Sequence, residues 1–399
     1  MHIAFISMGA LGHVLASLPF CGEMVKRGHR VSFFSAEFIR PQAEPFNVDF
    51  YAVESPLNNG GKGDENAAEN ILAELPLRFL NEAAAAVEDI LKVLENDRPD
   101  LIVNDTMAVS GRLAAAYLNI PRIQFFTSFA ANEHFNSCMH WPKELDETEP
   151  RKKALALAKE LQAKYGGHLL TTEEIMAGSA DFNIVTVDRN FQPAEKTFDE
   201  RFCFVGPQIA QRAGEAEWID PTPGKKIIYV SLGTVFNNLP EFWPMLFEAV
   251  KNIDAHVICS IGNMVDPDAL GPVPPNVSLY RFLPQLKVLE STDAFVSHGG
   301  IGSIMEATWM KVPTFCIPQM DEQCVTASKV KELRIGDAIL PPDRVNAQLL
   351  RKGIEDLLSN QEYRTRIEQF SSFMHENEGP GKAADAVEAY FEKLSPAGD

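Results

Sequence analysis

The feature that most constrains this chain is a regular alternation between short apolar runs and segments whose apolar residues recur at helical spacing. In the first half, runs of strand length lie at residues 2–8, 31–35, 101–104, 122–126 and 182–187, with a weaker one at 49–53. Helical patterns lie between them, at 14–25, 67–95 and 110–118. Strands that alternate with helices form parallel sheets, because each helix carries the chain back to the edge where the next strand starts. The first half is therefore predicted to be an α/β domain.

The alternation stops at residues 206–226, which are rich in Pro, Gly and Ala, and then begins again. The second series of strands is expected at 227–232, 256–261, 277–282, 294–297 and 314–317, with helices at 241–251, 303–310, 322–333, 348–358, 361–375 and 383–393. We predict an N-terminal domain over 1–205, an interdomain linker over 206–226 and a C-terminal domain over 227–399. We leave open whether the last helix, at about 383–393, packs back on the N-terminal domain.

Composition excludes several classes of protein. The 399 residues are 45% apolar, enough for two ordinary cores, and carry a net charge of -19. An acidic chain without clustered Lys and Arg lacks the electrostatic footprint of nucleic-acid binding, and its charge disfavours an anionic membrane surface. No apolar run reaches the length of a transmembrane helix, and the first residues lack the basic segment of a signal peptide. The six cysteines form no C-x-x-C pair, so we expect free thiols, a cytoplasmic location and no membrane insertion.

Two strand ends in the second half carry residues suited to a phosphate group, because ligands of open parallel sheets bind at the carboxyl ends of strands. The first is Ser231-Leu232-Gly233-Thr234, in which a glycine between two hydroxyls lets backbone N–H groups approach a phosphate. Taken alone, this sequence is equally that of a plain turn.

The second strand end is more specific. In residues 295–303, FVSHGGIGS, a strand ends at His298 and three glycines open the turn into a helix. We expect Ser303 to cap that helix, whose N-terminus would present free N–H groups and a partial positive charge to a diphosphate. His298 is expected to donate to a phosphate oxygen, and Glu306, one turn later, to accept from ribose hydroxyls. The alternative is a tight turn with a capping serine, which leaves the histidine and the glutamate without a role.

Three sequence blocks together carry a family resemblance: RFLPQ at 281–285, HGGIGSIME at 298–306 and PQMDEQ at 318–323. Their order and spacing resemble the donor signature of family 1 glycosyltransferases, most closely the bacterial macrolide-glycosyltransferase type. A weaker resemblance extends from His13 to the C-terminal helices. It implies an α/β chain with the GT-B fold, in which two Rossmann-like domains have parallel sheets facing a central cleft and the second domain holds most of the nucleotide-sugar donor.

The resemblance also implies roles for the matching residues. Phe282 stands where the family usually has a tryptophan stacked on the base, and Leu283, with Gln285 nearby, would offer backbone groups to a uracil edge. His298, Gly302 and Ser303 would hold the diphosphate, Glu306 the ribose, and Glu322 with Gln323 the hydroxyls of the sugar. The complete predicted donor site is Ser231, Gly233, Thr234, Phe282, Leu283, Gln285, His298, Gly300, Gly302, Ser303, Glu306, Glu322 and Gln323. We expect no metal and no cofactor beyond a UDP-sugar or dTDP-sugar donor, and the only D-x-D sequence, at 266–268, lies in a Pro-rich loop.

A candidate for acid–base chemistry lies in the first half. His13 follows the first strand in a turn, and Asp105 ends another strand of the same half, so that a parallel sheet can bring them together. An imidazole backed by a carboxylate is the usual arrangement for removing a hydroxyl proton. Separately, each residue has an ordinary explanation, since a lone histidine in a turn is commonly solvated and an aspartate after a strand commonly caps a helix. In the family, the matching histidine is the general base and the matching aspartate orients it.

The acceptor is expected to lie against the first half, where Phe, Met and His are dense between residues 125 and 141. Candidate walls are Met8, Met107, Phe126, Phe129, Phe135 and Met139, with the loop at 58–63. The same side chains could instead form ordinary core. An apolar surface that contains methionine suits phenols, macrolides or terpenoids.

These inferences predict an inverting, metal-independent glycosyltransferase that moves a hexose, glucose by default, from a UDP-sugar or dTDP-sugar to a hydroxyl of a small lipophilic acceptor. Three alternatives remain. A nucleotide-sugar epimerase would need no His13–Asp105 pair aimed at an acceptor. An NAD(P) dehydrogenase would carry the sequence G-x-G-x-x-G, whereas this chain has only Gly9-x-x-Gly12. A non-catalytic binding protein with the same fold would keep its function without His13.

Overall fold

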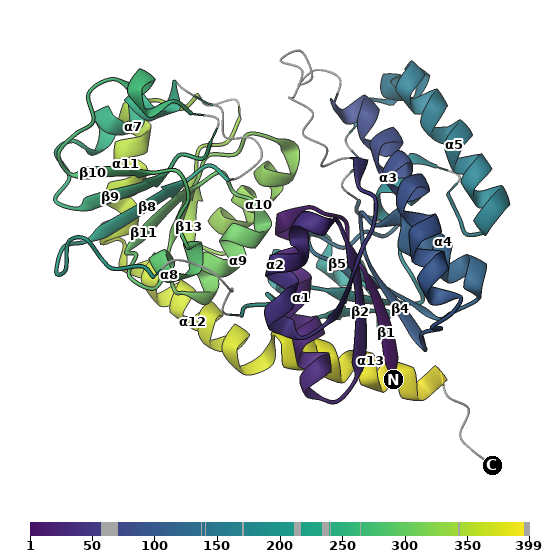
Figure 1. Cartoon of the computed structure of the whole chain (residues 1–399). Coiled ribbons are helices and arrows are strands. Elements are labelled where there is room, and N and C mark those ends of the chain that lie inside the picture. The colour runs from purple at the N-terminus through teal and green to yellow at the C-terminus, as the bar shows by residue number, and fades with distance from the viewer. Residues whose placement is uncertain are drawn as a thin grey trace. The chain divides into compact units, whose positions relative to one another are not determined.

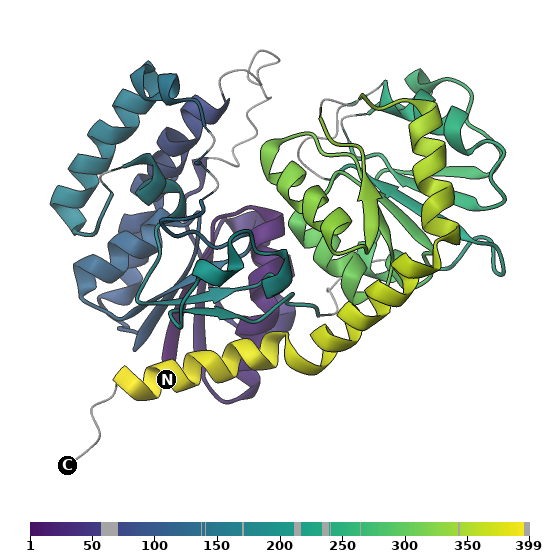
Figure 2. The ribbon, with the colours of Figure 1, turned by 180° about the vertical axis from the view of Figure 1, so that it is seen from behind.

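The computed structural model describes residues 1–56, 71–136, 138–139, 141–169, 171–210, 217–233, 239, 241–263, 265–341 and 344–394. The chain divides into two compact units, Met1–Ala213 together with Glu378–Asp399, and Gly214–Asn377. Each unit has its own parallel sheet with helices packed on it (Figures 1 and 2). The boundary near residue 213 falls within the segment 206–226. The chain from Glu378 onward belongs to the first unit, so the second unit ends well before residue 399.

The first unit is built on a seven-stranded sheet in the order β3-β2-β1-β4-β5-β6-β7. Its strands are β1 (His2–Ile6), β2 (Arg30–Ser35), β3 (Asp49–Ala52), β4 (Leu101–Asp105), β5 (Arg122–Phe126), β6 (Phe182–Val185) and β7 (Phe202–Phe204). All neighbouring strands pair in parallel, and β4 lies between β1 and β5. The carboxyl ends of β1, β4 and β5 are therefore adjacent.

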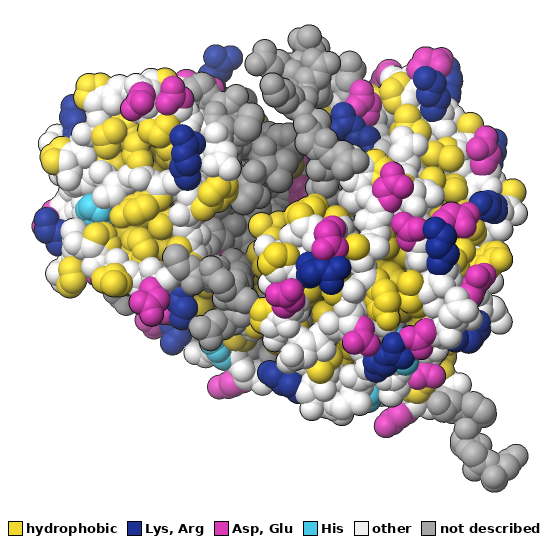
Figure 3. Space-filling view, in the orientation of Figure 1, with side chains coloured by type: hydrophobic (Ala, Val, Ile, Leu, Met, Phe, Trp, Pro, Cys, Tyr) yellow, Lys and Arg dark blue, Asp and Glu magenta, His cyan; other side chains and the backbone are white. Residues whose placement is uncertain are grey.

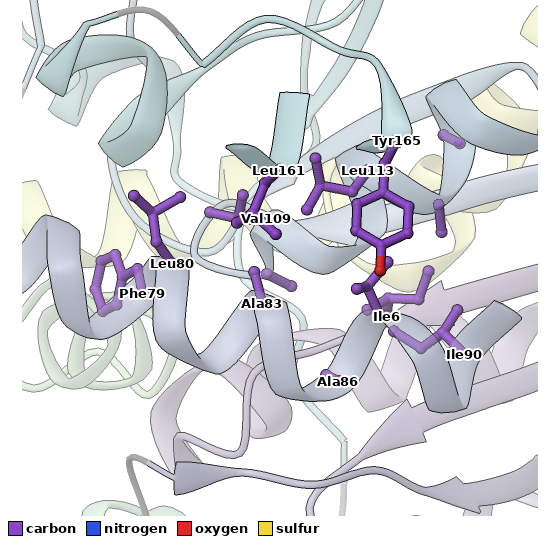
Figure 4. Packing of buried hydrophobic residues seen from close by; sticks show 14 of the residues in the cluster. Ile6, Phe79, Leu80, Ala83, Ala86, Ile90, Val109, Leu113, Leu161 and Tyr165 are labelled. Carbon is purple, nitrogen blue, oxygen red and sulfur yellow. The ribbon is translucent and has the colours of Figure 1, made fainter. Parts of the chain in front are cut away.

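Helices cover both faces of this sheet, which explains why most of its strand residues are apolar. The helices are α1 (Leu11–Lys26), α2 (Arg40–Ala43), α3 (Ile71–Leu94), α4 (Val109–Leu118), α5 (Glu149–Tyr165), α6 (Thr172–Ala177) and α13 (Pro380–Leu394). Ala4 and Ile6 of β1 pack in one core with α3, α4 and α5 (Figure 4). Ile3 and Phe5 point to the opposite face and pack in a second core with α1 and α13.

Helix α13 completes the first unit although it comes from the far end of the chain (Figure 1). Its apolar side chains Ala383, Ala384 and Val387 are fully buried in the core that contains α1. At the rim, the Arg27 guanidinium donates to Asp385 and to Glu388, at 2.7 Å in each case. Burial of an apolar stripe, with ion pairs along its edge, therefore holds this helix on the first unit.

The second unit contains a six-stranded parallel sheet in the order β10-β9-β8-β11-β12-β13. Its strands are β8 (Ile227–Ser231), β9 (His256–Ser260), β10 (Val277–Tyr280), β11 (Ala294–Ser297), β12 (Thr314–Cys316) and β13 (Gly336–Ala338). Its helices are α7 (Phe242–Val250), α8 (Gln285–Leu289), α9 (Ile301–Trp309), α10 (Asp321–Glu332), α11 (Ala347–Ser359) and α12 (Gln361–Asn377). Strand β11 pairs with β8 on one side and β12 on the other, so the chain segments that follow these three strands leave the sheet side by side.

On the face shown in Figure 3, Lys and Arg side chains are scattered among acidic ones and do not gather into a patch. All six cysteines are free thiols. Among the described residues, no helix is both long enough and apolar enough to cross a membrane.

A fully buried carboxyl group, Asp188, and a partly buried one, Glu378, lie where the chain returns to the first unit. Asp188 is fully buried, and neither its Oδ2 nor Glu378 Oε2 has a hydrogen-bond partner among the described residues. Burial, followed by the charge of Asp188, raises the pKa of Glu378 to about 9, and Lys382 acts in the opposite direction. One proton on Glu378 would therefore satisfy both oxygens at neutral pH. Gly206, at φ 64°, leaves the space, because a side chain at that position would overlap the Glu378 carboxyl group.

We expect Glu378→Gln to make stability less dependent on pH. The folded chain keeps a proton up to about pH 9, whereas an unfolded glutamate loses it near pH ~4.3. The pair's contribution is thus fully present below that lower value and is lost as pH rises towards 9. The amide cannot ionise. At pH 8, the free energy of unfolding measured in urea should therefore be higher for the variant than for the parent protein, by on the order of 1–2 kcal/mol. Glu376→Gln, at an exposed glutamate, is the control, and equal pH slopes for all three proteins would contradict the shared proton.

Candidate active site

The first cluster of polar side chains lies at the carboxyl edge of the sheet in the first unit. The chain leaves β1 and enters α1 at Leu11, so His13 lies in the first turn of that helix and not in a loop before it. Asp105 is the last residue of β4, and Thr127 directly follows β5. His13 Nδ1 lies 2.8 Å from Asp105 Oδ1 and 2.7 Å from Thr127 Oγ1. Side chains at or after the ends of three neighbouring strands therefore lie together, with the His13 imidazole in contact with the other two.

The Asp105 carboxylate is fully buried and is satisfied by donors from β1 and β4. In addition to His13, the backbone N–H of Met107 donates to Oδ1 at 3.2 Å and that of Met8 donates to Oδ2 at 3.4 Å. Asp105 does not cap the following helix, because α4 has Ala108 at its N-cap. The carboxylate is thus held in one orientation by hydrogen bonds, as a buried charge requires.

This geometry determines which nitrogen of His13 can act as a base. A carboxylate oxygen only accepts, so the hydrogen between His13 and Asp105 belongs to Nδ1. In the neutral ring, Nε2 then carries the lone pair and can take a proton. The side chain of His13 is 18% exposed whereas that of Asp105 is fully buried. The pair therefore has the form of a base that reaches solvent and a carboxylate that orients it.

The predicted acceptor residues separate into different environments. Phe126 is fully buried and its ring lies 6.3 Å from that of Phe202, so the prediction that it lines a surface site is wrong. The rings of Phe129 and Phe135, both partly buried, meet edge-on at 6.0 Å. Met139 is exposed, whereas Met8 is nearly buried and Met107 partly so. The predicted loop at 58–63 lies outside the described residues.

The second cluster lies at the carboxyl ends of β8 and β11 in the second unit. The imidazole of His298 occupies a space that two glycines leave for it. A Cβ at Gly233, whose φ is 87°, would lie 2.8 Å from His298 Nε2, and a Cβ at Gly300 would lie 2.5 Å from the same atom. Ser231, the last residue of β8, is buried, and its Oγ accepts from the Gly233 N–H at 3.4 Å. Thr234 lies outside the described residues.

Burial keeps the His298 ring uncharged. It lowers the pKa of His298 to about 4, and a hydrogen bond with the Ser231 backbone acts in the opposite direction. Nδ1 is buried and has no hydrogen-bond partner among the described residues. A diphosphate placed against Nδ1 would favour a proton there, and the resulting hydrogen bond would satisfy the buried atom.

Helix α9 presents its N-terminus beside this histidine, but not as predicted. The helix begins at Ile301 with Gly300 at the N-cap and no side-chain cap, so the prediction that Ser303 caps it is wrong. Ser303 is the third helical residue, and its Oγ lies 3.3 Å from Gln285 Nε2. Among the described atoms, a Cβ at Gly302 would meet none within 4 Å, so the space beside this residue of the first turn is open. The N–H groups of that turn have no partner within the helix, which makes the space suited to an anion.

The residues predicted for the nucleoside lie where β10 leads into α8. Phe282 is 59% exposed, which is unusual for a phenyl ring and leaves a face for stacking. Leu283 is partly buried against the core formed by β8, β11 and α9. Gln285 begins α8, and its Nε2 donates to Glu306 Oε2 at 2.7 Å. Gln285 therefore orients the carboxylate that was predicted to bind the ribose.

The remaining predicted residues begin α10. Glu322 is exposed, whereas Gln323 is buried and its Oε1 accepts from the Gln319 N–H at 2.8 Å. The amide of Gln323 thus closes the turn before the helix. No group of three or more His, Cys, Asp or Glu residues in the described part of the chain could hold a metal ion. In the D-x-D sequence, Asp266 accepts from the Asp268 N–H at 3.1 Å, as a cap does.

Comparison with known proteins decides the family. Residues 244–389 match the C-terminal domain of erythromycin biosynthesis protein CIII-like proteins. The NDP-glycosyltransferase YjiC of Bacillus subtilis is 34% identical over 98% of this chain and 98% of its own. The oleandomycin glycosyltransferase of Streptomyces antibioticus is 28% identical over 100% of this chain and 94% of its own. This chain belongs to the family 1 glycosyltransferases, of the bacterial macrolide-glycosyltransferase type.

Solved structures of glycosyltransferases show the same fold. The calicheamicin glycosyltransferase superposes with a TM-score of 0.82, at 30% identity over 99% of both chains. The glycosyltransferase of kitacinnamycin superposes with a TM-score of 0.86, at 28% identity over 97% of this chain and 98% of that one. The protein therefore has the GT-B fold, and its membership in the family sets aside the epimerase, dehydrogenase and non-catalytic alternatives.

We expect substitutions of His298 and of Gly300 in this glycosyltransferase to weaken the binding of a nucleoside diphosphate for the same reason, so that their effects are not additive. His298→Ala removes a hydrogen bond to a charged group, so it should weaken UDP binding about ten- to hundredfold in isothermal titration calorimetry. Gly300→Ala should have a similar effect, because the added methyl group takes the place of the imidazole. The double variant should then bind no more weakly than either single variant, and additive losses would contradict the coupling.

Proposed function

We propose that this glycosyltransferase moves a hexose, glucose by default, from a UDP-sugar or dTDP-sugar to a hydroxyl of a small lipophilic acceptor, with inversion and without a metal. The observation that carries the proposal is the hydrogen bond between His13 Nδ1 and the buried Asp105 carboxylate. It makes Nε2 the basic nitrogen of a partly exposed ring, which is what the removal of a hydroxyl proton requires.

In the proposed reaction, Nε2 of His13 takes the proton of the acceptor hydroxyl. The acceptor oxygen forms a bond to the anomeric carbon as the bond from that carbon to the diphosphate oxygen breaks. The electron pair of the broken bond leaves with the nucleoside diphosphate, and attack from the opposite face inverts the configuration. Asp105 stabilises the imidazolium that forms, and the proton is later released to solvent.

Groups of the second unit would stabilise the negative charge that develops on the leaving diphosphate. The first-turn N–H groups of α9 supply partial positive charge without any net charge. His298, whose Nδ1 has no hydrogen-bond partner in the described part of the chain, would add a hydrogen bond. Phe282 would stack on the base, and Glu306, oriented by Gln285, would accept from the ribose hydroxyls. The helix N–H groups and the His298 hydrogen bond support the proposal that the leaving group is stabilised without a metal ion.

Relatives that are named for oleandomycin and calicheamicin support an acceptor of the natural-product kind. The described residues available for it in the first unit are the pair Phe129 and Phe135, exposed Met139, and partly buried Met107. Aromatic and thioether side chains adapt to flat, apolar molecules of different shapes.

The base is tested with His13→Ala and Asp105→Asn, assayed with UDP-glucose and a simple phenol. Loss of a positioned base should lower kcat roughly 10²–10⁴-fold in each variant, while UDP binding stays within about twofold of the parent protein because neither residue is expected to touch the nucleotide. Anomeric NMR of the product should show the β-glucoside from the α-linked donor, and EDTA should leave the rate unchanged. An active His13→Ala variant, a retained α configuration or a strict metal requirement would each refute the mechanism.

A further inference from the structure

Besides Asp105, the side chain of Thr127 touches the imidazole of His13, and neither the sequence motifs nor the family resemblance pointed to it. Thr127 Oγ1 lies 2.7 Å from the same Nδ1 that lies 2.8 Å from Asp105 Oδ1. Strands β4 and β5 pair in register, with Asp105 opposite Phe125, so that the carboxylate and the hydroxyl approach the ring from adjacent strand ends. The imidazole therefore has two oxygen neighbours on one nitrogen, contributed by two different strands.

These two distances restrict where the hydrogens can be. Because the carboxylate of Asp105 has no hydrogen to give, Nδ1 must carry the hydrogen between them. Thr127 Oγ1, at 2.7 Å from that N–H, then accepts a share of the same hydrogen in a three-centre bond. In the opposite arrangement, in which the threonine donated to a bare Nδ1, the carboxylate would face a lone pair at 2.8 Å with no hydrogen between them. The hydroxyl is thus a second acceptor for the ring.

We propose that Thr127 is a positioning residue for the general base, whose hydroxyl shares the Nδ1 hydrogen with Asp105. This inference rests on the proposed role of His13. A single hydrogen bond lets an imidazole swing about the bond axis, whereas two acceptors on separate strands hold the plane of the ring and the direction of Nε2. The Nδ1 hydrogen bears more positive charge once Nε2 has taken the acceptor proton. Both oxygens therefore stabilise the imidazolium more than the neutral ring.

The titration of this imidazole depends on the charged groups near it. Asp105 on β4 touches it directly. Behind the carboxylate lies Arg112 on α4, whose buried guanidinium has its pKa lowered to about 9 by burial, with Arg122 adding to this shift and Asp105 opposing it. Thr127→Val changes neither of these charged groups, so a shift in the titration of the ring in this variant is assigned to the lost contact with the Thr127 hydroxyl.

The test compares Thr127→Val, which keeps the shape of the side chain and removes the hydroxyl, with Thr127→Ser, which keeps the hydroxyl. Thr127→Val should lower kcat about two- to tenfold, the effect of one neutral hydrogen bond. It should also move the acidic limb of the kcat/KM profile to lower pH, because the protonated ring loses an acceptor. The KM for UDP-glucose should stay unchanged, and Thr127→Ser should behave as the parent protein in all three measurements.

A second readout does not depend on turnover. In the full-length protein without substrate, NMR titration of the His13 ring signals, assigned with His13→Ala, should give a lower midpoint for Thr127→Val and an unchanged one for Thr127→Ser. If Thr127→Val raises only the KM for the donor and leaves both the midpoint and the pH limb in place, the hydroxyl binds the sugar and the proposal is wrong. If the midpoint moves but His13→Ala remains active, the contact is real and it is the role of His13 as base that fails.

Discussion

The hydrogen bond that His13 makes to the buried carboxylate of Asp105 is the interaction on which the chemistry of the first unit depends. A carboxylate removed from water is tolerated only when donors surround it. Here the donors are one imidazole N–H and the backbone N–H groups of Met8 and Met107, which follow β1 and β4. These strand ends are neighbours only because the sheet is parallel and β4 pairs directly with β1. The fold and the base are therefore stabilised by the same set of contacts.

The second unit has a different electrostatic requirement. The chain has a net charge of -19 and would have to bind a negatively charged diphosphate in order to act as proposed. In the proposed site, the described residues would do so with oriented dipoles in place of a cluster of cations. The N-terminus of α9 faces open space at Gly302, and beside it the ring of His298 is kept neutral by burial. Gly233 and Gly300 are required there because the imidazole occupies the space that their side chains would take.

Much of this arrangement could be predicted from local patterns, and the failures have physical reasons. The apolar runs of β1, β4, β5, β8 and β11 were predicted because strands buried on both faces carry few polar residues. Strands β7 and β13, each of three residues, were missed, whereas β12, which is equally short, was predicted as part of the run at 314–317. Helix α5 was missed because its buried side includes Arg151, Ala154 and Ala158, which make a weak apolar stripe. The wrong roles of Ser303 and Phe126 have one cause, because the start of a helix and the depth of a side chain depend on neighbouring elements.

By itself, the sequence determined the α/β class, the identity of the His13 and Asp105 pair, and the glycine-opened turn that precedes α9. These follow from patterns within a few residues, namely apolar periodicity and the residue types that end strands. Only the tertiary structure decided that Thr127 reaches the same nitrogen as Asp105, that Gln285 holds Glu306, and that the last helix belongs to the first unit. Each of these contacts joins residues about 20 or more positions apart. The order of the strands and the burial of side chains bring these residues together, and neither can be predicted from a pattern within a few residues.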